Sequence, residues 1–102
     1  MIARIWRGWT SAATADDYQR HYESEVAEHL RRAEGFCGGC LLRCDDGGEV
    51  MFTSIAFFAG LDAVRRLTGE DYWQAVVENA AHPALTRWDG WVSHHEVCVD
   101  LM

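Results

Sequence analysis

Arg4 is the first residue whose type and position could do chemistry. It lies on a strand predicted over residues 1–10 and shares its parity with Trp6. A guanidinium that faces inward from a central strand needs an anion or several hydrogen-bond acceptors. Arg4 could therefore hold a phenolate or enolate oxygen. The alternative is a structural ion pair with a carboxylate such as Glu49 or Asp71.

Two histidines are candidates for a general base. His95 lies on the apolar parity of a last strand predicted over residues 90–99, together with Trp91 and Val97. A neutral imidazole there could take a proton from a phenol, and the alternative is a hydrogen-bonded core histidine. His82, in a predicted loop, is the second candidate, although loop histidines are often merely exposed.

Aromatic rings are frequent enough to build a binding site. Flat aromatic walls with one or two polar groups are typical of a site for a planar ligand. The alternative is that the same rings simply fill a core. The rings concerned are Trp6, Tyr72, Trp73, Trp88 and Trp91, with His82 and His95 expected nearby.

Four cysteines raise the question of a metal or redox site. Cys37 and Cys40 have the spacing of such a pair, and Cys44 adds a third thiol. A zinc site needs a second pair of ligands, and only Cys98 remains. A redox pair should open a helix, where the dipole lowers the thiol pKa, but this pair opens a predicted strand. We expect no metal site and assign these thiols to packing.

One face of the first predicted helix carries His21, Glu25 and His29 at four-residue spacing. Such a face could bind a transition metal opportunistically. We expect instead a solvated face with a Glu25–His29 pair. The sequence contains no Ser/His/Asp arrangement, P-loop or GxGxxG motif.

The stretch over residues 49–61 organises the elements that must position these side chains. It is rich in aromatic and β-branched residues and is bounded by glycines, which predicts a strand. Apolar residues occupy both of its parities, so both faces require burial. One parity carries Met51, Ile55 and Phe57, and the other carries Val50, Phe52 and Phe58.

The remaining pattern completes a ferredoxin-like α+β fold. A helix is predicted from a Thr14 N-cap to about Ala33, with an apolar stripe of Tyr18, Tyr22, Val26, Leu30 and Ala33. A strand over residues 36–44 precedes an Asp-Asp-Gly-Gly hairpin turn. A short helix over residues 61–69, one or two helical turns over 71–78 and an irregular segment over 79–89 follow. The order βαββαβ predicts a four-stranded antiparallel sheet with both helices on one face.

The other face of this sheet would be bare and apolar, which usually marks an interface. We therefore expect a homodimer. The chain of 102 residues suits a single domain over residues 1–102.

Charge and hydropathy exclude several classes of protein. A net charge of −7 without any basic run argues against a nucleic-acid partner. No apolar run approaches the ~20 residues of a membrane span, so no membrane partner is expected. The N-terminus lacks the apolar stretch of a signal peptide, so we expect a cytoplasmic protein with reduced thiols.

Several stretches resemble antibiotic biosynthesis monooxygenase-like domains, over nearly the whole chain. They are residues 1–8 (MIARIWRG), 40–43 (CLLR), 47–50 (GGEV), 69–72 (GEDY) and 94–97 (HHEV). The resemblance implies a ferredoxin-like subunit that pairs sheet to sheet into a dimeric α+β barrel. The family includes cofactor-free oxygenases of polycyclic phenols, quinol oxygenases, haem-degrading enzymes and proteins of no known activity.

The resemblance also implies where a site would lie. Trp6 takes the family's pocket-facing position on the first strand, and Tyr72 and Trp73 lie on the segment that roofs the pocket. The haem-degrading branch uses an Asn, a Trp and a ligand His. Matching the elements places Trp6, Leu67 and Val77 at those positions, so all three are lost; His82 is five residues beyond the last.

The sequence therefore predicts a cofactor-free monooxygenase of a small phenol- or quinol-type substrate. Its alternatives are a non-catalytic dimeric module that binds a hydrophobic metabolite and, third, a haem-handling protein. Fold alone does not decide among them. The predicted catalytic residues are His95, His82, Arg4 and Tyr72, and the predicted substrate-binding residues are Trp6, Trp73, Trp88 and Phe52.

Overall fold

A single sheet of five strands forms the frame of the structure, a computed structural model that describes residues 1–102. Two long central strands, β1 (Ile2–Ser11) and β3 (Glu49–Phe58), pair along their whole length. β2 (Phe36–Asp46) pairs with β3 and forms one edge. The other edge is divided, because β4 (Leu85–Trp88) pairs with one end of β1 and β5 (Ser93–Glu96) pairs with the other.

The divided edge refines the predicted topology. The strand order is β2-β3-β1-β4, with β5 also beside β1, and all pairs are antiparallel. β4 and β5 together take the place of the single last strand predicted over residues 90–99. The ferredoxin-like α+β class is confirmed, with its fourth strand broken in two.

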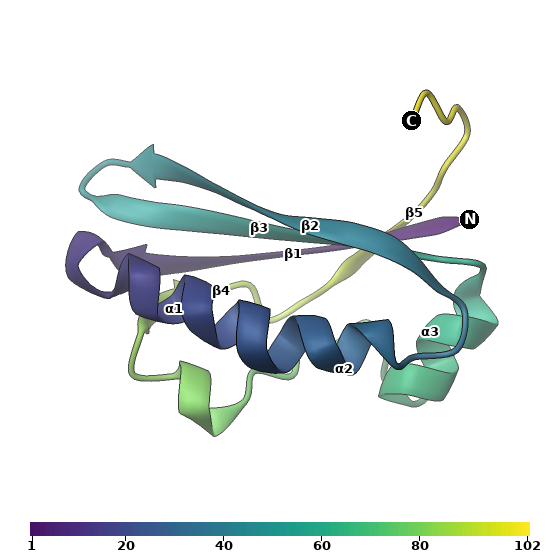
Figure 1. Cartoon of the computed structure of the whole chain (residues 1–102), viewed down its shortest axis with the longest axis horizontal. Helices are drawn as coiled ribbons and strands as arrows, with labels where there is room; N and C mark the ends of the chain where they lie inside the picture. The colour runs from purple at the N-terminus through teal and green to yellow at the C-terminus, as the bar shows by residue number, and fades with distance from the viewer.

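All helices lie on one face of this sheet (Figure 1). The longest is a continuous helical run made of α1 (Ala15–His21), η2 (Tyr22–Val26) and α2 (Ala27–Arg31). The others are α3 (Leu61–Thr68) and the 3₁₀ turns η1 (Ala12–Thr14) and η3 (Asn79–Ala81). No helix is long and apolar enough to cross a membrane.

The middle of the helical run, η2, is π-helical. The inward side chains Tyr18, Tyr22, Val26 and Leu30 repeat every four residues. An α-helix completes a turn in about 3.6 residues, so a strict four-residue spacing drifts around the helix. One wider turn corrects that drift and keeps the four side chains facing the sheet. The predicted apolar stripe is confirmed, because these four belong to or pack against the main core cluster and its fifth member, Ala33, packs against a smaller one.

The helix start differs from the prediction. Thr14 makes no side-chain cap for the helix. Its hydroxyl donates instead to the carbonyl oxygen of Ala84, at 2.8 Å. The predicted side-chain cap is wrong because the Thr14 hydroxyl ties the helix start to the segment that leads into β4.

The helical turns predicted over residues 71–78 do not form. The backbone of this segment pairs with the chain between β4 and β5: Val92 N–H donates to the Trp73 carbonyl (2.8 Å) and Ala75 N–H to the Gly90 carbonyl (3.0 Å). These two bonds make an isolated antiparallel bridge, called here the roof bridge. It holds residues 71–78 as a roof over the space between the sheet and the helical run.

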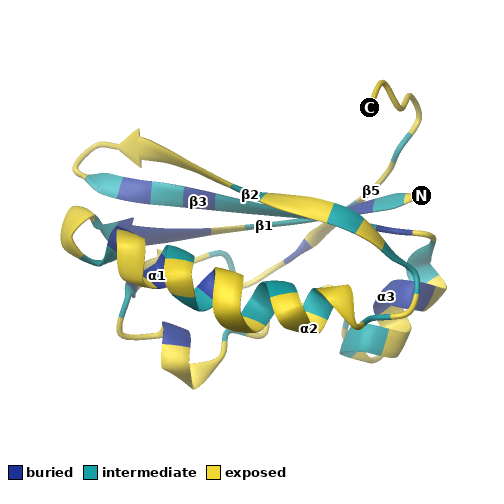
Figure 2. Cartoon of the chain, in the orientation of Figure 1, coloured by how far each residue is buried: buried dark blue, intermediate teal, exposed yellow.

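The core lies between the sheet and the helices, as the dark blue segments of Figure 2 show. The larger cluster of buried residues consists of Ala15, Tyr18, Tyr22, Val50, Phe52, Ala81 and Leu85. The smaller one consists of Ala56, Phe58, Ala63 and Val64. Both draw on the same parity of β3, which confirms that this strand centres the fold.

The opposite face of the sheet carries no helix. Met51, Ile55 and Phe57, on the second parity of β3, are only half-buried within one chain. Both neighbours of β3 add apolar residues to this face, such as Ile5 opposite Ile55 on β1. This surface, called here the open sheet face, is what the two-sided apolar pattern of the strand predicts.

Candidate functional site

A cavity of about 350 Å³ lies between β1, β3, the helical run and the roof segment. Most of its lining is apolar, which suits a flat hydrophobic ligand. Its polar members come from the sheet, the helices and the roof segment. The lining consists of Arg4, Trp6, Tyr18, His21, Tyr22, Val26, His29, Leu30, Ser54, Ala56, Leu67, Thr68, Ala75, Val76, Val77, Glu78, Ala81 and Val92.

Arg4 faces this cavity from β1, as its parity predicts, and it has no carboxylate partner. Its Nη1 donates to the carbonyl oxygen of Tyr72 and contacts Nε2 of His94 at 2.9 Å. The predicted alternative partner Glu49 pairs instead with Arg87, at 3.2 Å. Burial lowers the pKa of Arg4, yet a guanidinium keeps its charge at neutral pH. Arg4 therefore brings to the cavity a positive charge whose own hydrogen-bond partners are all neutral.

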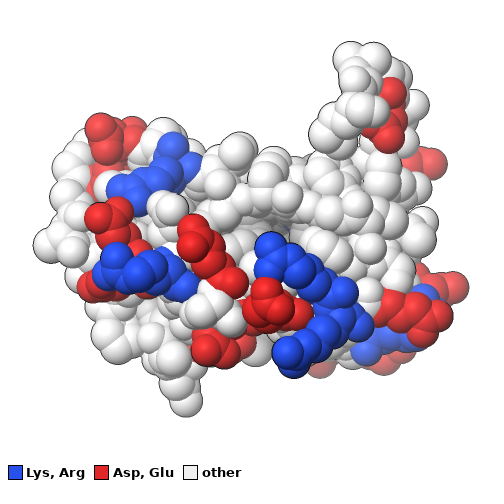
Figure 3. Space-filling view, viewed as in Figure 1, with Lys and Arg blue, Asp and Glu red and all other residues white.

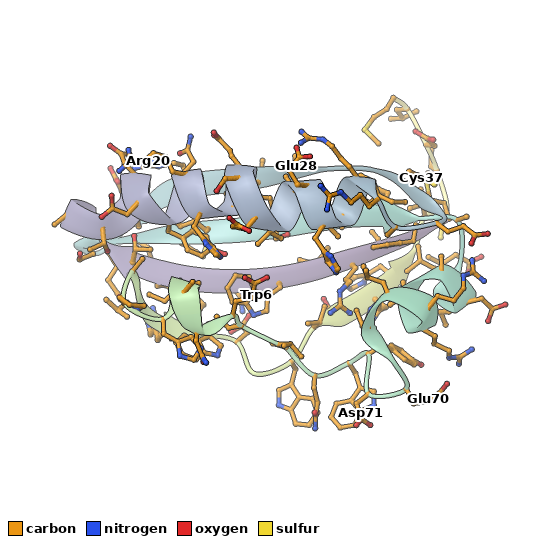
Figure 4. The ribbon with its side chains drawn as sticks, turned by 60° about the horizontal axis from the view of Figure 1, so that its bottom comes forward. Trp6, Arg20, Glu28, Cys37, Glu70 and Asp71 are labelled. Atoms are coloured by element: carbon orange, nitrogen blue, oxygen red, sulfur yellow. The ribbon has the colours of Figure 1, made fainter.

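Trp6 lines the cavity beside Arg4, also as predicted. Its indole N–H donates to the carbonyl oxygen of Asp89 at 2.9 Å, which fixes the ring. Figure 4 shows Trp6 on the side of the sheet that faces the roof segment. Trp6 thus supplies one flat wall of the cavity, and its polar edge is already satisfied.

His94, and not His95, is the histidine of β5 that lies beside Arg4. His94 pairs across from Arg4, whereas His95 pairs across from Ala3 on the open sheet face. The Nε2 of His95 lies 2.9 Å from the hydroxyl of Ser93, and its side chain is exposed. The prediction that His95 reaches the cavity is wrong.

The error has a physical cause. Trp91 and Val97 made the parity of His95 look buried, but both lie outside the paired strand, which spans only Ser93–Glu96. Apolar residues beyond a strand say nothing about which of its faces is covered.

Tyr72 touches this cluster without lining the cavity. Its carbonyl accepts from Arg4, and its ring meets that of His94 edge-on, with centroids 5.2 Å apart. Burial, with Arg4 next in importance, lowers the pKa of His94, so the neutral imidazole that can accept a hydrogen bond from Arg4 is favoured. His94 and Tyr72 therefore hold Arg4 from behind.

The helical run contributes two histidines that were predicted to lie on a solvated face. His21 and His29 both line the cavity, while Glu25 is exposed. The Nε2 of His21 lies 4.0 Å from a carboxylate oxygen of Glu78 in the roof segment. The expected Glu25–His29 pair is not formed. The spacing of the two histidines could have predicted this position. His21 follows Tyr18, and His29 follows Val26, by three residues, which places each histidine on the same side of the helix as the apolar stripe.

Two tyrosines, Tyr18 and Tyr22, add further polar groups to the cavity lining. The Tyr22 hydroxyl shares a hydrogen bond of 2.8 Å with Ser54 on β3. Burial raises the pKa of Tyr22 and that of Tyr18, so both phenols are neutral at physiological pH. A neutral hydroxyl near the cavity can donate a hydrogen bond to a ligand oxygen.

Four other predicted residues lie outside the cavity. His82 stacks on Trp88, with centroids 4.9 Å apart, at the exposed side of β4. Trp73 stacks on Trp91 at 4.8 Å, outside the roof. Phe52 is fully buried against Tyr18. It borders a second groove of about 610 Å³ between the helical run and β2. The prediction that these four residues line the cavity is wrong. The rings of His82, Trp88 and Trp73 stack on other rings outside the cavity, and the ring of Phe52 fills the core.

The cysteines do not pack in the core, contrary to the prediction. All four are exposed in the single chain. Cys40 and Cys44 pair across from Ile55 and Met51 on the open sheet face. No group of three or more His, Cys, Asp or Glu side chains is arranged to hold a metal ion.

Comparison with known proteins finds solved structures that share this fold. No protein-family model and no curated protein matches the sequence. Among solved structures, a mutant of MhuD with two manganese protoporphyrin IX molecules per active site is 20% identical, with coverage of 100% of this chain and 99% of that one and a TM-score of 0.72. MhuD is described as a haem-degrader from Mycobacterium tuberculosis.

Two further neighbours are oxygenases by description. SnoaB, a cofactor-independent oxygenase from Streptomyces nogalater, is similar in mutant form at 16% identity, with 98% and 95% coverage and a TM-score of 0.65. An antibiotic biosynthesis monooxygenase is similar at 16% identity, with 97% and 100% coverage and a TM-score of 0.63. At these identities the likeness shows the fold, and the expected resemblance to antibiotic biosynthesis monooxygenase-like domains is confirmed at that level.

Proposed function

We propose that this chain, which has the antibiotic biosynthesis monooxygenase-like fold, binds a planar phenol- or quinol-type ligand in the cavity beside Arg4 and oxidises it with O₂ as a cofactor-independent monooxygenase. The observation that carries the proposal is the guanidinium of Arg4, which faces an apolar cavity without a carboxylate partner. Its Nε and Nη2 donate no hydrogen bond within the chain. They are free to hold an oxygen anion.

The reaction needs a general base, a group that stabilises an anion and a cavity that excludes water. Deprotonation of an electron-rich phenol gives an anion that can transfer one electron to O₂. Recombination of the resulting radical and superoxide gives a hydroperoxide, and loss of water leaves a carbonyl. In total a CH₂ group and O₂ become C=O and H₂O. Arg4 would stabilise the anion inside a cavity of low polarity, where such an interaction is strong.

His21 replaces His95 and His82 as our candidate for the base. Its side chain is 14% exposed and lines the cavity, and the carboxylate of Glu78 lies 4.0 Å from its Nε2. A histidine that lines the cavity is within reach of a proton on a ligand bound there. Trp6 and the aliphatic side chains of the helical run would hold the rings of the ligand.

The test compares Arg4→Gln with Arg7→Gln, a matched change on the opposite face of the same strand. The probe is 1-hydroxy-2-naphthoate, and uncharged 1-naphthol is its neutral counterpart. We expect Arg4→Gln to weaken binding of the anion about tenfold or more, which equals about 1.4 kcal/mol, and to leave binding of 1-naphthol nearly unchanged. Arg7→Gln should change neither. Equal affinity of wild type and Arg4→Gln for the anion, measured by calorimetry, would contradict the proposal.

A second measurement distinguishes a catalytic protein from one that only binds the ligand. An oxygen electrode should record uptake of O₂ when an anthrone-type phenol is added to the purified chain without any cofactor. Binding without uptake would support the alternative of a non-catalytic module for a hydrophobic metabolite.

Haem handling remains the other candidate, favoured by the similarity to MhuD. In its support, Trp6, Leu67 and Val77, the positions matched to that branch, all line the cavity. Against it, none of the three has the side chain of the haem-degrading pattern. A Soret shift on titration with hemin that is lost in His21→Phe or His29→Phe would favour this candidate.

A further inference from the structure

We propose that Gly8 is a specificity-determining residue: by carrying no side chain it lets the Trp6 indole rest against β1, and it thereby sets the space left for the ligand. The inference rests on the proposed function, because it concerns the same cavity. It adds a residue that does not line the cavity itself.

The contact between the two residues is tight. A Cβ atom added at Gly8 would lie 2.5 Å from Cη2 and 3.1 Å from Cζ3 of Trp6. It would also lie 3.2 Å from Cδ2 of Leu85. Separations under 3.0 Å are not tolerated between carbon atoms, so the benzene ring of Trp6 occupies the place that a side chain at position 8 would take.

The backbone does not require glycine at this position. Gly8 is not among the glycines with positive φ. It sits in regular pairing with Phe52 of β3 and with Trp88 of β4. Because alanine could adopt this extended conformation without strain, the absence of a side chain matters for the neighbouring ring and not for the fold of the strand.

A methyl group at position 8 would push the Trp6 indole away from β1. The indole N–H is held by the carbonyl of Asp89, and Leu85 crowds the same side of the sheet. The ring must therefore lift away from β1, toward the helical run. That space is the cavity, so Gly8→Ala is expected to narrow it while leaving its polar groups in place.

The experiment uses Gly8→Ala, Trp6→Leu and the double variant in the full chain. With 1-hydroxy-2-naphthoate as probe, Gly8→Ala should weaken binding about tenfold or more. Trp6→Leu removes the ring that is displaced, so the double variant should bind within about threefold of Trp6→Leu alone. A merely structural effect of Gly8→Ala would persist in the double variant. Thermal melts confirm that each variant is folded.

Two results would overturn the inference. One is unchanged probe affinity in folded Gly8→Ala. The other is a double variant as weak as Gly8→Ala while Trp6→Leu alone binds well.

A ligand-free readout separates this inference from the proposed function. The Trp6 indole N–H resonance, assigned with Trp6→Phe, should shift in Gly8→Ala without any probe. If wild type fails to bind the probe, the proposed function is contradicted. The indole shift then still decides whether Gly8 positions Trp6, because an unchanged resonance overturns the inference.

Discussion

Arg4 and Arg7 lie on the same strand but face opposite sides of the sheet, and their surroundings show what alternation alone can predict. Arg7 is exposed and pairs with Asp89 at 3.0 Å. Arg4 faces the cavity and has only neutral acceptors. Strand parity predicted the positions of Arg4 and Trp6 because β1 is long and central. It failed for His95 because β5 is short, and its neighbours in sequence leave the sheet.

The titration of His94 gives a prediction about stability. Burial and the nearby Arg4 lower its pKa in the folded chain, so the unfolded chain binds more protons below about pH 6.5. The stability that His94 contributes is present above that pH and is lost as pH falls through the folded pKa. Urea melts at pH 7.5 and 5.5 should show this loss. In His94→Gln, which keeps an acceptor for Arg4 but does not titrate, the difference between the two melts should shrink; an identical difference would contradict the assignment.

His21 gives a prediction about catalysis. If it is the base, His21→Asn should lower kcat about 10²-fold or more and change KM little, because the ring removed is small compared with the cavity lining. His29→Asn, on the same face of the helical run, is the matched control and should retain most of kcat. Equal losses in both variants would show that the histidines act only on the shape of the cavity.

At the scale of elements, the long strands, the hairpin and the first helix were predictable, because each repeats one period over many residues. Gly47 and Gly48 both have positive φ, as the Asp-Asp-Gly-Gly turn requires. The roof segment was not predictable from local pattern. Its backbone bonds to residues 90–92, and a pairing of two short irregular segments leaves no periodic trace in either of them.

The π-helical turn gives a prediction about the helical run. Ser24 is exposed there, and its hydroxyl donates to the carbonyl of Arg20 at 2.9 Å. Deleting Ser24 should convert the wide turn into an α-helical one and leave Val26 and Leu30 on the face toward the sheet. Deleting Glu28, outside that turn, should rotate the rest of the helix by about 100° and unfold the chain. Circular dichroism melts distinguish the two; equal damage from both deletions would contradict this account.

At the scale of the whole molecule, one face of the sheet still lacks a cover. Acidic and basic side chains are interspersed along the helical run (Figure 3), where Arg20 pairs with Asp17 and Arg31 with Glu28. The open sheet face instead presents half-buried Met51, Ile55 and Phe57. We therefore keep the prediction of a homodimer, which the sequence already favoured from the two-sided strand.

The dimer is tested by sedimentation at micromolar concentration. An interface of this kind commonly buries about 2,000 Å² or more in total, so wild type should sediment as a dimer. Ile55→Asp would place a carboxylate in that interface and should yield monomer or unfolded chain. Val76→Asp, the same type of change at an exposed roof residue, should remain dimeric. A monomeric wild type would refute the prediction.

The roof bridge has a consequence for the timing of ligand exchange. The same two backbone bonds join the roof, which lines one side of the cavity, to the chain between β4 and β5. A ligand that leaves past the roof requires those bonds to open. The amide hydrogens of Ala75 and Val92 should therefore exchange with deuterium at a rate tied to ligand release. The exchange rate at these two sites would then report the residence time of the bound ligand.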